Sequence, residues 1–383
     1  MRCLTSFVAV LTFLVQDVAA VGSAFGYATG TTGGGSATAQ TPSSNAELVS
    51  WLGDSTARVI VLDKIYDFTD SEGSATGTAC APWTCSPNPQ LAIDQNSWCE
   101  NYEAGAAKTT VTYKKAGITP IAVGSNKTLL GKGKAGGIAG KGLKITGKSN
   151  IIIQNIRIYQ INPQFVWGGD AIQIDGGSKI WIDHNYIQYI GRQMVVTGYG
   201  AVTAATFSNN VFEGAGTYSA TCNGRHYWAA LFTGNGDQIT FALNYVYMTS
   251  GRGPHVGGTS GYKQYIHAYN NYYVSVAGHA FDPQVGAYVL AEGNYFNTVD
   301  QPVTTATGYA FLPVDSTHTA QCSSYIGRAC VANTALSSGT LNRNDLGALS
   351  AFTSATYVKS ASVKAASEVG AFVQANAGLG IIN

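Results

Sequence analysis

The sequence predicts an all-β protein that folds as a parallel β-helix, and two observations carry this prediction. Only 11% of the 383 residues are charged, well below the roughly 25% of an average soluble domain, and 46 glycines supply many tight turns. In addition, six short β-like runs end in an asparagine that is followed by an apolar or aromatic residue. Their spacings of 30, 25, 34, 27 and 23 residues match the period of a solenoid coil. The six are Asn155, Asn185, Asn210, Asn244, Asn271 and Asn294.

The repeated asparagine has a physical reason. Asparagine tolerates the left-handed backbone conformation of a tight corner, and its amide can hydrogen-bond to the backbone there. Coils stacked at about 4.8 Å would bring successive amides close enough to form a ladder, with branched and aromatic neighbours inside a dry cylinder. A β-sandwich would also have evenly spaced strands, but it gives no reason for one residue type at six turns. We therefore expect an asparagine ladder along a parallel β-helix.

The chain begins with a stretch typical of a secretory signal, residues 1–20. Arg2 supplies the positive end, an apolar run from Leu4 to Val15 follows, and Val18-Ala19-Ala20 forms a small-residue cleavage site. About 12 apolar residues are too few to span a bilayer, which takes ~20. We expect a secreted, extracellular protein with no membrane partner. Residues 21–383 are predicted to form one β-helix domain, in which residues 301–383 contribute loops and a helix packed on the cylinder.

The segments outside the repeats predict long N-terminal loops and short helices. Ser44 and Glu47 form a capping box ahead of an apolar stretch that ends at Gly53. Residues 67–105 read as a long irregular loop, and such a loop inside a compact domain is usually functional. Residues 357–376 carry apolar residues at helical spacing and stop at Gly378. We expect this helix to cover the cylinder, because an open solenoid exposes strand edges.

Cysteine usage agrees with an exported chain. Removing the signal leaves six cysteines, and an even number in an exported protein implies up to three disulfides. Spacing alone favours only the near-neighbour pair Cys322–Cys330. The chain has one glycosylation sequon, Asn126-Lys127-Thr128, so Asn126 is the predicted glycosylation site.

Charge and aromatic residues narrow the class of partner. Lys+Arg 22 against Asp+Glu 21 gives a net charge of +1, which argues against nucleic acid or another polyanion. Most tryptophans instead lie in irregular sequence, where flat aromatic faces can pack against sugar rings. Any one of them could be ordinary core filling, but together they favour a groove for a sugar polymer. The predicted substrate-binding residues are Trp83, Trp98, Tyr102, Trp167, Tyr227 and Trp228.

Groups able to do catalysis are scarce. Asp170, Asp175 and Asp183 are the acids near the repeats that we consider as calcium ligands; they support a calcium site only weakly, and we expect no metal and no cofactor. The chain has no nucleophile-elbow motif and no Asp-Asp pair, which disfavours Ser/His/Asp catalysis and hydrolysis by paired carboxylates.

Two arginines remain as catalytic candidates. Arg192 lies seven residues after Asn185, and Arg252 lies eight after Asn244. If the ladder forms, both project from the same side about two coils apart, or ~10 Å, and Asp170 lies one coil earlier. A surface arginine is commonly just a solvated charge. Arg252 differs because Gly251 precedes it and Gly253-Pro254 follow, so that its backbone is tightly held.

These residues match a known family. From about residue 22 to 378 the sequence resembles the secreted pectin lyases of fungi and other plant-degrading eukaryotes, within the wider pectate lyase superfamily of right-handed parallel β-helices. The resemblance is carried by Cys80-Ala81-Pro82-Trp83, Trp98-Cys99-Glu100-Asn101-Tyr102, Val166-Trp167-Gly168-Gly169-Asp170, Trp181-Ile182-Asp183-His184, Ile190-Gly191-Arg192-Gln193, His226-Tyr227-Trp228, Thr249-Ser250-Gly251-Arg252 and Gly278-His279-Ala280-Phe281.

The resemblance implies endo-acting cleavage of methyl-esterified pectin (homogalacturonan) by β-elimination, which leaves a 4,5-unsaturated sugar. It makes Arg252 the base that removes the C5 proton. Arg192 and Asp170 occupy the region where calcium-dependent pectate lyases place acidic ligands, and a fixed guanidinium there makes calcium unnecessary. We expect Arg192 and Asp170 to set the charge environment of Arg252 and to polarise the C6 carbonyl. The disulfides implied by the family are Cys80–Cys99, Cys85–Cys222 and Cys322–Cys330.

Two other functions are also compatible with the sequence. One is a calcium-dependent pectate lyase that acts on unesterified polymer, and the other is a non-catalytic sugar-binding β-helix. The chain also departs from the family pattern in two places: the Cys80–Cys99 loop is short between Trp83 and Cys85, and Arg225 adds a charge before His226. Nothing in the sequence suggests oligomerisation, and we expect a monomer.

Overall fold

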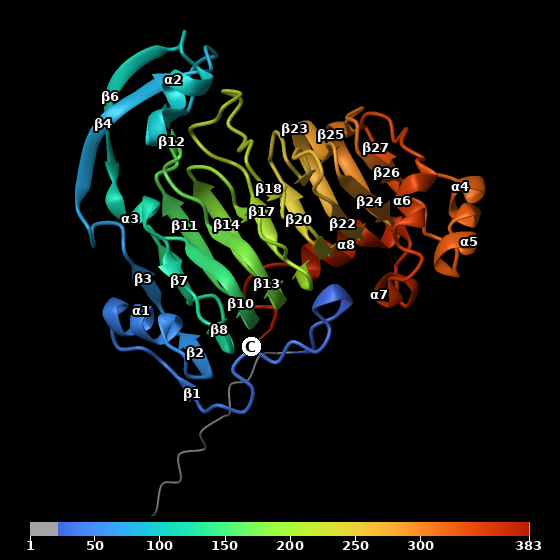
Figure 1. The fold of residues 1–383 in the computed structure, drawn as a ribbon, viewed down its shortest axis with the longest axis horizontal. Coiled ribbons are helices and arrows are strands. Elements are labelled where there is room, and N and C mark those ends of the chain that lie inside the picture. Colours follow the sequence, from blue (N-terminus) through green and yellow to red (C-terminus); the bar gives the residue numbers. More distant parts are fainter. Residues whose placement is uncertain (1–21, 383) are drawn as a thin grey trace, which may run out of the picture.

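The computed structural model describes residues 22–382, which wind into a right-handed parallel β-helix whose coils stack along one long axis (Figure 1). Twenty-three strands form one sheet, and neighbouring coils pair in parallel register. The predicted fold class is confirmed. The predicted signal, residues 1–20, lies outside the described residues. Within 22–382, no helix has the length and apolar character needed to cross a membrane.

Each coil contributes strands to three faces of the cylinder. The first face comprises β7 (Ile121–Ala122), the first halves of β10 (Leu143–Gln154) and β13 (Ile172–Asp183), β15 (Val195–Thr197), β18 (Ala230–Phe232), β21 (His255–Val256) and the end of β23 (Tyr272–Pro283). The second comprises β1 (Ala39–Gln40), β2 (Arg58–Leu62), β8 (Lys127–Gly131), the second halves of β10 and β13, β16 (Ala205–Ser208), β19 (Asp237–Ala242), β22 (Gln264–Tyr269), β24 (Ala287–Glu292) and β26 (Tyr309–Phe311). The third comprises β3 (Ile65–Asp67), β9 (Gly137–Ala139), β11 (Arg157–Ile161), β14 (Tyr186–Ile190), β17 (Val211–Glu213), β20 (Tyr245–Tyr247), the start of β23, β25 (Tyr295–Val303) and β27 (Thr334–Leu336).

The interior of the cylinder is apolar because side chains alternate along each strand and the inward rows are aliphatic or aromatic. In β10 and β13 the inward residues Ile151, Ile153, Ile180 and Ile182 have no measurable exposure and belong to one continuous core. Aromatic residues fill the middle coils, where Phe207 and Phe232 lie 5.4 Å apart between ring centroids. The fully apolar β-branched runs of the sequence are thus the inward rows of stacked strands.

The asparagine ladder forms between the second and third faces. From Asn185 onward each side-chain amide donates to the next amide oxygen at 2.9–3.0 Å, and the ladder extends to Asn333, which the sequence did not reveal. Asn155 is not a rung: the register places Ile156 opposite Asn185, and the Asn155 amide bonds to Gly131 and Gly133 oxygens.

The left-handed conformation predicted for the ladder asparagines is wrong. At the five rungs from Asn185 to Asn294, the left-handed residue is the one before the asparagine, such as His184 at φ 53° or Leu243 at φ 61°. The ladder asparagines themselves serve as hydrogen-bond bridges. Each amide also donates to a carbonyl of the coil before it, as Asn244 does to Phe207 at 3.0 Å.

The predicted loop, residues 67–105, contributes two strands to a second, smaller sheet. This sheet consists of β4 (Ser74–Ala81), β5 (Leu91–Ile93), β6 (Ala107–Lys114) and β12 (Phe165–Val166), of which β4 and β6 form a long antiparallel pair. The short helices η2 (Gln95–Ser97) and α2 (Trp98–Tyr102) lie between β5 and β6, and α3 (Lys115–Ile118) follows β6. The segment predicted as irregular is therefore partly ordered, because cross-strand threonines replace the apolar pattern that marks a strand.

The N-terminal segment covers part of the second face. η1 (Gly26–Ala28) packs there, and Ala24 and Ala28 bury Trp181, which lies outside the cylinder rather than in its core. The capping-box helix is confirmed as α1 (Asn45–Gly53), with the Ser44 hydroxyl accepting from the Glu47 amide.

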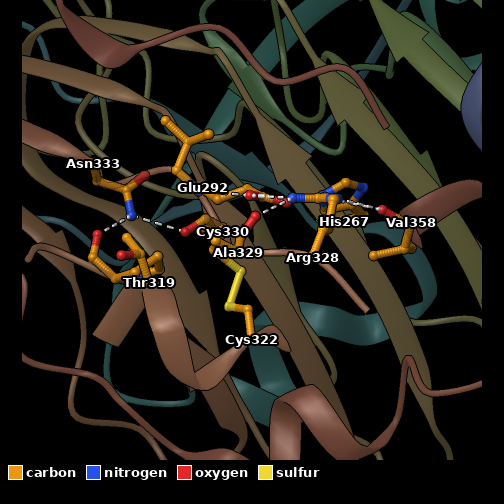
Figure 2. Close-up of a disulfide and its surroundings, with 12 residues drawn as sticks. His267, Glu292, Thr319, Cys322, Arg328, Ala329, Cys330, Asn333 and Val358 are labelled. Atoms are coloured by element: carbon orange, nitrogen blue, oxygen red, sulfur yellow. Dashed lines mark hydrogen bonds and ion pairs between the residues drawn. A yellow bond between two sulfur atoms is a disulfide. The ribbon is translucent and has the colours of Figure 1, made fainter. Parts of the chain in front are cut away.

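The C-terminal segment covers the far end of the cylinder and then runs back along its side (Figure 1). The far end holds α4 (Ser316–Gln321), α5 (Ser323–Ile326), α6 (Leu346–Ser350) and α7 (Thr356–Lys359), and α8 (Ala366–Asn376) lies along the third face. The single helix predicted over 357–376 is thus two, since residues 360–365 interrupt it. Figure 2 shows the Cys322–Cys330 disulfide, whose loop directs Arg328 onto buried Glu292, which His267 also contacts.

Candidate functional site

Arg252 is held rigidly at the corner between β20 and β21. Its backbone has φ 49°, and its carbonyl accepts from the Ala230 amide at 2.6 Å. Gly251 is packed so closely on Tyr227 that a Cβ there would lie 2.5 Å from the ring. The glycines that made Arg252 stand out in the sequence therefore fit a close aromatic contact.

The Arg252 guanidinium lies between aromatic rings and carries unpaired donors. It lies 4.7 Å from the Trp228 ring centroid and 6.0 Å from that of Tyr227. Among the described residues, neither its Nε nor its buried Nη1 finds a hydrogen-bond partner. Burial, assisted by the positive charge of Arg192, lowers the pKa of Arg252 from 12.5 to about 10. Such a group is a more available base than an ordinary arginine.

Arg192 and Asp170 form the other half of the site. Arg192 follows β14 and Arg252 follows β20, with one coil between them at β17, as the spacing predicted. The Arg192 guanidinium lies 3.6 Å from an Asp170 carboxylate oxygen and 4.1 Å from the Trp167 ring centroid. The other Asp170 oxygen accepts from the Gln193 amide at 2.7 Å. Burial raises the pKa of Asp170, and the Arg192 charge opposes that rise.

The six aromatic residues predicted from the sequence form two groups, each beside one arginine. In the first, Trp98 lies 6.1 Å from Tyr102 and 6.0 Å from Trp167, which faces Arg192. The second group comprises Trp83, Trp228 and Tyr227, with Trp228 facing Arg252.

The two aromatic groups differ in how much of their ring surface remains exposed. Arg192 and Arg252 lie over the faces of Trp167 and Trp228, so these two rings hold the cations. Tyr102 is 73% exposed and lines a pocket of about 410 Å³ with Trp98 and Trp167, so the free aromatic surface lies there.

Disulfides connect the aromatic groups to the cylinder. The three bonds join Cys80 to Cys99, Cys85 to Cys222 and Cys322 to Cys330, the same pairs that the family resemblance implied. Trp83, Trp98, Trp167 and Trp228 pack around the Cys80–Cys99 bond. Of the three bonds, only Cys85–Cys222, with a sequence separation of 137, joins distant parts of the chain, and it ties the loop that carries Trp83 to the segment before His226.

Sequence reasoning missed a histidine–carboxylate cluster beside the arginines. The Asp282 carboxylate accepts from His255 Nδ1 at 2.6 Å, from Gln284 at 2.8 Å and from Thr304 at 2.7 Å. His279 stacks edge-on against Tyr227 at 5.6 Å, and its Nε2 lacks a hydrogen-bond partner within 22–382. The only sequence signal was His279 within a family motif, which carried no role.

The donor set does not fit the calcium site of the related fold. Among residues 22–382, no three His, Cys, Asp or Glu side chains gather where they could hold a metal ion. Asp170 faces Arg192, Asp175 accepts from the Gly200 amide, and Asp183 is occupied by His184 and Ser208. The three acids considered from the sequence therefore serve three separate places, and we derive no step through a metal.

Asn126 lies away from this site. Its side chain is exposed, and its amide oxygen accepts from Asn150 at 2.8 Å. Exposure is compatible with a glycan, and glycosylation at Asn126 stays a prediction.

The chain matches known sequences over nearly its whole length. A family model described as "Pectate lyase" matches residues 1–381. A "Probable pectin lyase A" of Aspergillus fumigatus is 50% identical over 367 residues, covering 95% of each chain. "Pectin lyase A" of Aspergillus niger is 47% identical, covering 99% of this chain and 100% of the relative, and "Pectin lyase B" of Emericella nidulans is 50% identical over 85% of each.

Solved structures share the fold at lower identity. A pectate lyase from a Bacillus species in complex with trigalacturonate has a TM-score of 0.61 at 20% identity, covering 94% of this chain and 100% of the other. A pectate lyase from Acidovorax avenae subsp citrulli has a TM-score of 0.57 at 19% identity, covering 98% and 99%. At this identity the likeness supports the fold alone.

Proposed function

Because the chain belongs to the pectate lyase family, we propose that it is a pectin lyase, which cleaves methyl-esterified homogalacturonan internally by β-elimination. The curated relatives that match it at about half identity carry that name. The observation that carries the proposal for this chain is the Arg252 guanidinium, buried among aromatic rings with Nε and Nη1 unpaired.

In the proposed reaction, Arg252 is the base and takes the proton from C5 of the sugar. The electron pair of the C–H bond forms the C4–C5 double bond and the C4–O bond breaks. The departing oxygen takes a proton from water, and Arg252 then returns the proton that it took to water. The cation of Arg192 is the group that would donate to the C6 carbonyl oxygen, on which negative charge develops. Asp170 holds the Arg192 side chain through its charge at 3.6 Å. Arg192 also lowers the pKa of Arg252, so it has two roles.

The electrostatics of the site favour an ester over a carboxylate. A C6 carboxylate placed beside Arg252 would add a negative charge, which raises the pKa of the base and keeps it protonated. A neutral methyl ester adds no such charge and also makes the C5 proton more acidic. The lowered pKa of Arg252 therefore persists only with an uncharged substrate, and this distinguishes a pectin lyase from a lyase for unesterified polymer.

The test is an assay of Arg252 variants on highly methylated pectin with a chelator present. Wild type is expected to form the unsaturated product at an unchanged rate with the chelator and to act poorly on low-ester polymer. Arg252→Ala is expected to lose about 100- to 10,000-fold in kcat, the usual contribution of a general base, and Arg252→Lys to retain part of the activity. Arg157→Ala is the matched control, because Arg157 also lies over tyrosine rings but on the third face.

Three outcomes would count against the proposal. Near-normal activity in both Arg252 variants would show that Arg252 is not the base. Loss of activity with the chelator would favour a calcium-dependent pectate lyase, and binding without product would favour a non-catalytic sugar-binding protein. The three disulfides and the fungal relatives agree with an extracellular protein. Secretion through residues 1–20 and a monomeric state belong to the proposal.

A further inference from the structure

A second pocket lies on the outer side of the second face, away from the arginines. It has a volume of about 560 Å³, and the residues that the argument uses are Tyr27, Lys263, Tyr265, Tyr288 and Tyr357. Strands β22 and β24 form its floor, while η1 and α7 form its walls. In Figure 1, α7 lies at the lower edge of the molecule, whereas α2, which begins at Trp98 of the Arg192 group, lies at the upper edge.

The floor is a tyrosine ladder produced by the parallel register. Tyr265, Tyr288 and Tyr309 stand opposite one another on successive coils, with ring centroids 5.4 and 5.3 Å apart. Tyr27 and Tyr357 meet edge to face at 6.2 Å on the wall. The result is a stretch of aromatic surface whose hydroxyls repeat along the cylinder axis.

A second tyrosine ladder in the same protein is covered. Tyr245, Tyr272 and Tyr295 stack on the third face at 5.6 and 5.2 Å, and α8 packs over them through Val369 and Val373. The ladder of the second face is only partly covered. Helix α6 packs against β24 and β26, with Gly347 close to the Tyr309 ring, yet Tyr309 stays 49% exposed and Tyr357 on the wall of the pocket 40% exposed. Aromatic surface left open in this way is typical of a binding site rather than of packing alone.

A single lysine gives the pocket a positive charge. Lys263 is the only charged residue among those that line it, and its side chain is exposed. Within 22–382, Lys263 forms no salt bridge. Serine and threonine hydroxyls of the α6–α7 segment line the rest. Aromatic rings with hydroxyls suit a sugar, and an unpaired ammonium suits a carboxylate.

We propose that this pocket is a second carbohydrate site, which binds a galacturonan segment with free carboxylates while the arginine groove cleaves an esterified segment. The choice of galacturonan rests on the proposed function. The two sites differ in the expected way: the cations of the groove are buried beside an aromatic wall and an acid, whereas Lys263 is open and unpaired. A partly esterified polymer contains both kinds of segment, so the pocket would hold the chain near the groove.

The test measures binding of unesterified hexagalacturonate by calorimetry. Lys263→Glu is expected to weaken binding at least about 10-fold, and Tyr357→Ala to weaken it several-fold. Lys359→Glu is the matched control, because Lys359 is exposed on α7 but does not line the pocket. Since both pocket variants change exposed side chains, they should fold as wild type does, which circular dichroism checks. Cellohexaose is expected not to bind.

A kinetic measurement separates this site from the groove. Lys263→Glu is expected to raise KM several-fold on long, partly esterified pectin and to leave kcat/KM unchanged on a short, fully esterified oligomer. Equal hexagalacturonate binding by Lys263→Glu and wild type would overturn the inference. A wild-type protein that forms no unsaturated product from methylated pectin would instead overturn the proposed function, so the two failures are distinct.

Discussion

The cover that Trp228 provides over Arg252 leads to a quantitative prediction. Burial is the largest cause that lowers the pKa of Arg252, and Trp228 lies 4.7 Å from its guanidinium carbon. The full lowering, from 12.5 to about 10, corresponds to about 3.4 kcal/mol at 1.36 kcal/mol per pKa unit. Below the pKa, the deprotonated fraction changes tenfold per unit, so this lowering raises the amount of free base about 300-fold.

Trp228→Ala should admit water to Arg252 and raise its pKa. Because Tyr227 and Arg192 remain, we expect part of the full effect, a fall in kcat of about 10- to 100-fold at pH 8. The rising limb of the kcat–pH profile should move to higher pH by one to two units, to about 11 or 12. The measurement is the initial rate of unsaturated-product formation at saturating substrate across this range.

A matched variant distinguishes the burial of Arg252 by the Trp228 ring from the hydrogen bond that Trp228 makes. The Trp228 indole nitrogen donates to Gln90 at 3.0 Å, and Trp228→Phe removes that bond while keeping an aromatic ring in place. We expect Trp228→Phe to leave the limb near its wild-type position. If Trp228→Ala changes only KM and leaves the limb where it was, the burial argument for Arg252 is wrong.

The remaining predictions concern charge and stability. Asp282→Asn removes a charge that raises the pKa of Arg252, so the rising limb should move to lower pH, opposite to Trp228→Ala, in the same rate measurement; a shift in the same direction would contradict it. Glu292→Gln should lower the free energy of unfolding by about 3 kcal/mol at pH 7, because the native pKa of Glu292 is about 2 against 4.5. This stability is fully present above about pH 4.5 and is lost as the pH falls through about 2, so urea curves of the two proteins should converge at low pH. Asn244→Ala breaks the ladder on both sides and should cost about 3 kcal/mol by the same urea measurement, and a cost below about 1 kcal/mol would show that the ladder is dispensable.

The network around Glu292 explains why a single substitution there should strongly lower the free energy of unfolding. Figure 2 shows the carboxylate receiving Arg328 and His267, with nitrogen–oxygen distances of 2.6 and 2.8 Å. Removing the charge leaves the half-buried Arg328 with backbone carbonyls but no anionic partner, and this costs more than the loss of an exposed pair would.

The sequence alone determined the coil and much of the site. An asparagine that recurs every coil must bridge to its neighbours to satisfy its amide, so the period and the ladder could be read directly. The same period placed Arg192 and Arg252 on one side two coils apart. The position of the tryptophans in polar loop sequence predicted that they gather in one region, and they do so around the Cys80–Cys99 bond and the two arginines, whereas their role in binding substrate stays a prediction.

Tertiary structure decided what each of these groups touches. Nothing local indicates that Arg252 lies against Trp228, or that Asp282 stands beside His255, because these contacts join residues from different coils. The pKa of Arg252 depends on burial by distant loops, which the Cys80–Cys99 bond and the second sheet hold in place. Local pattern fixes which residues point inward and how often the chain turns, whereas desolvation is a property of everything packed around a group, and only the folded chain specifies it.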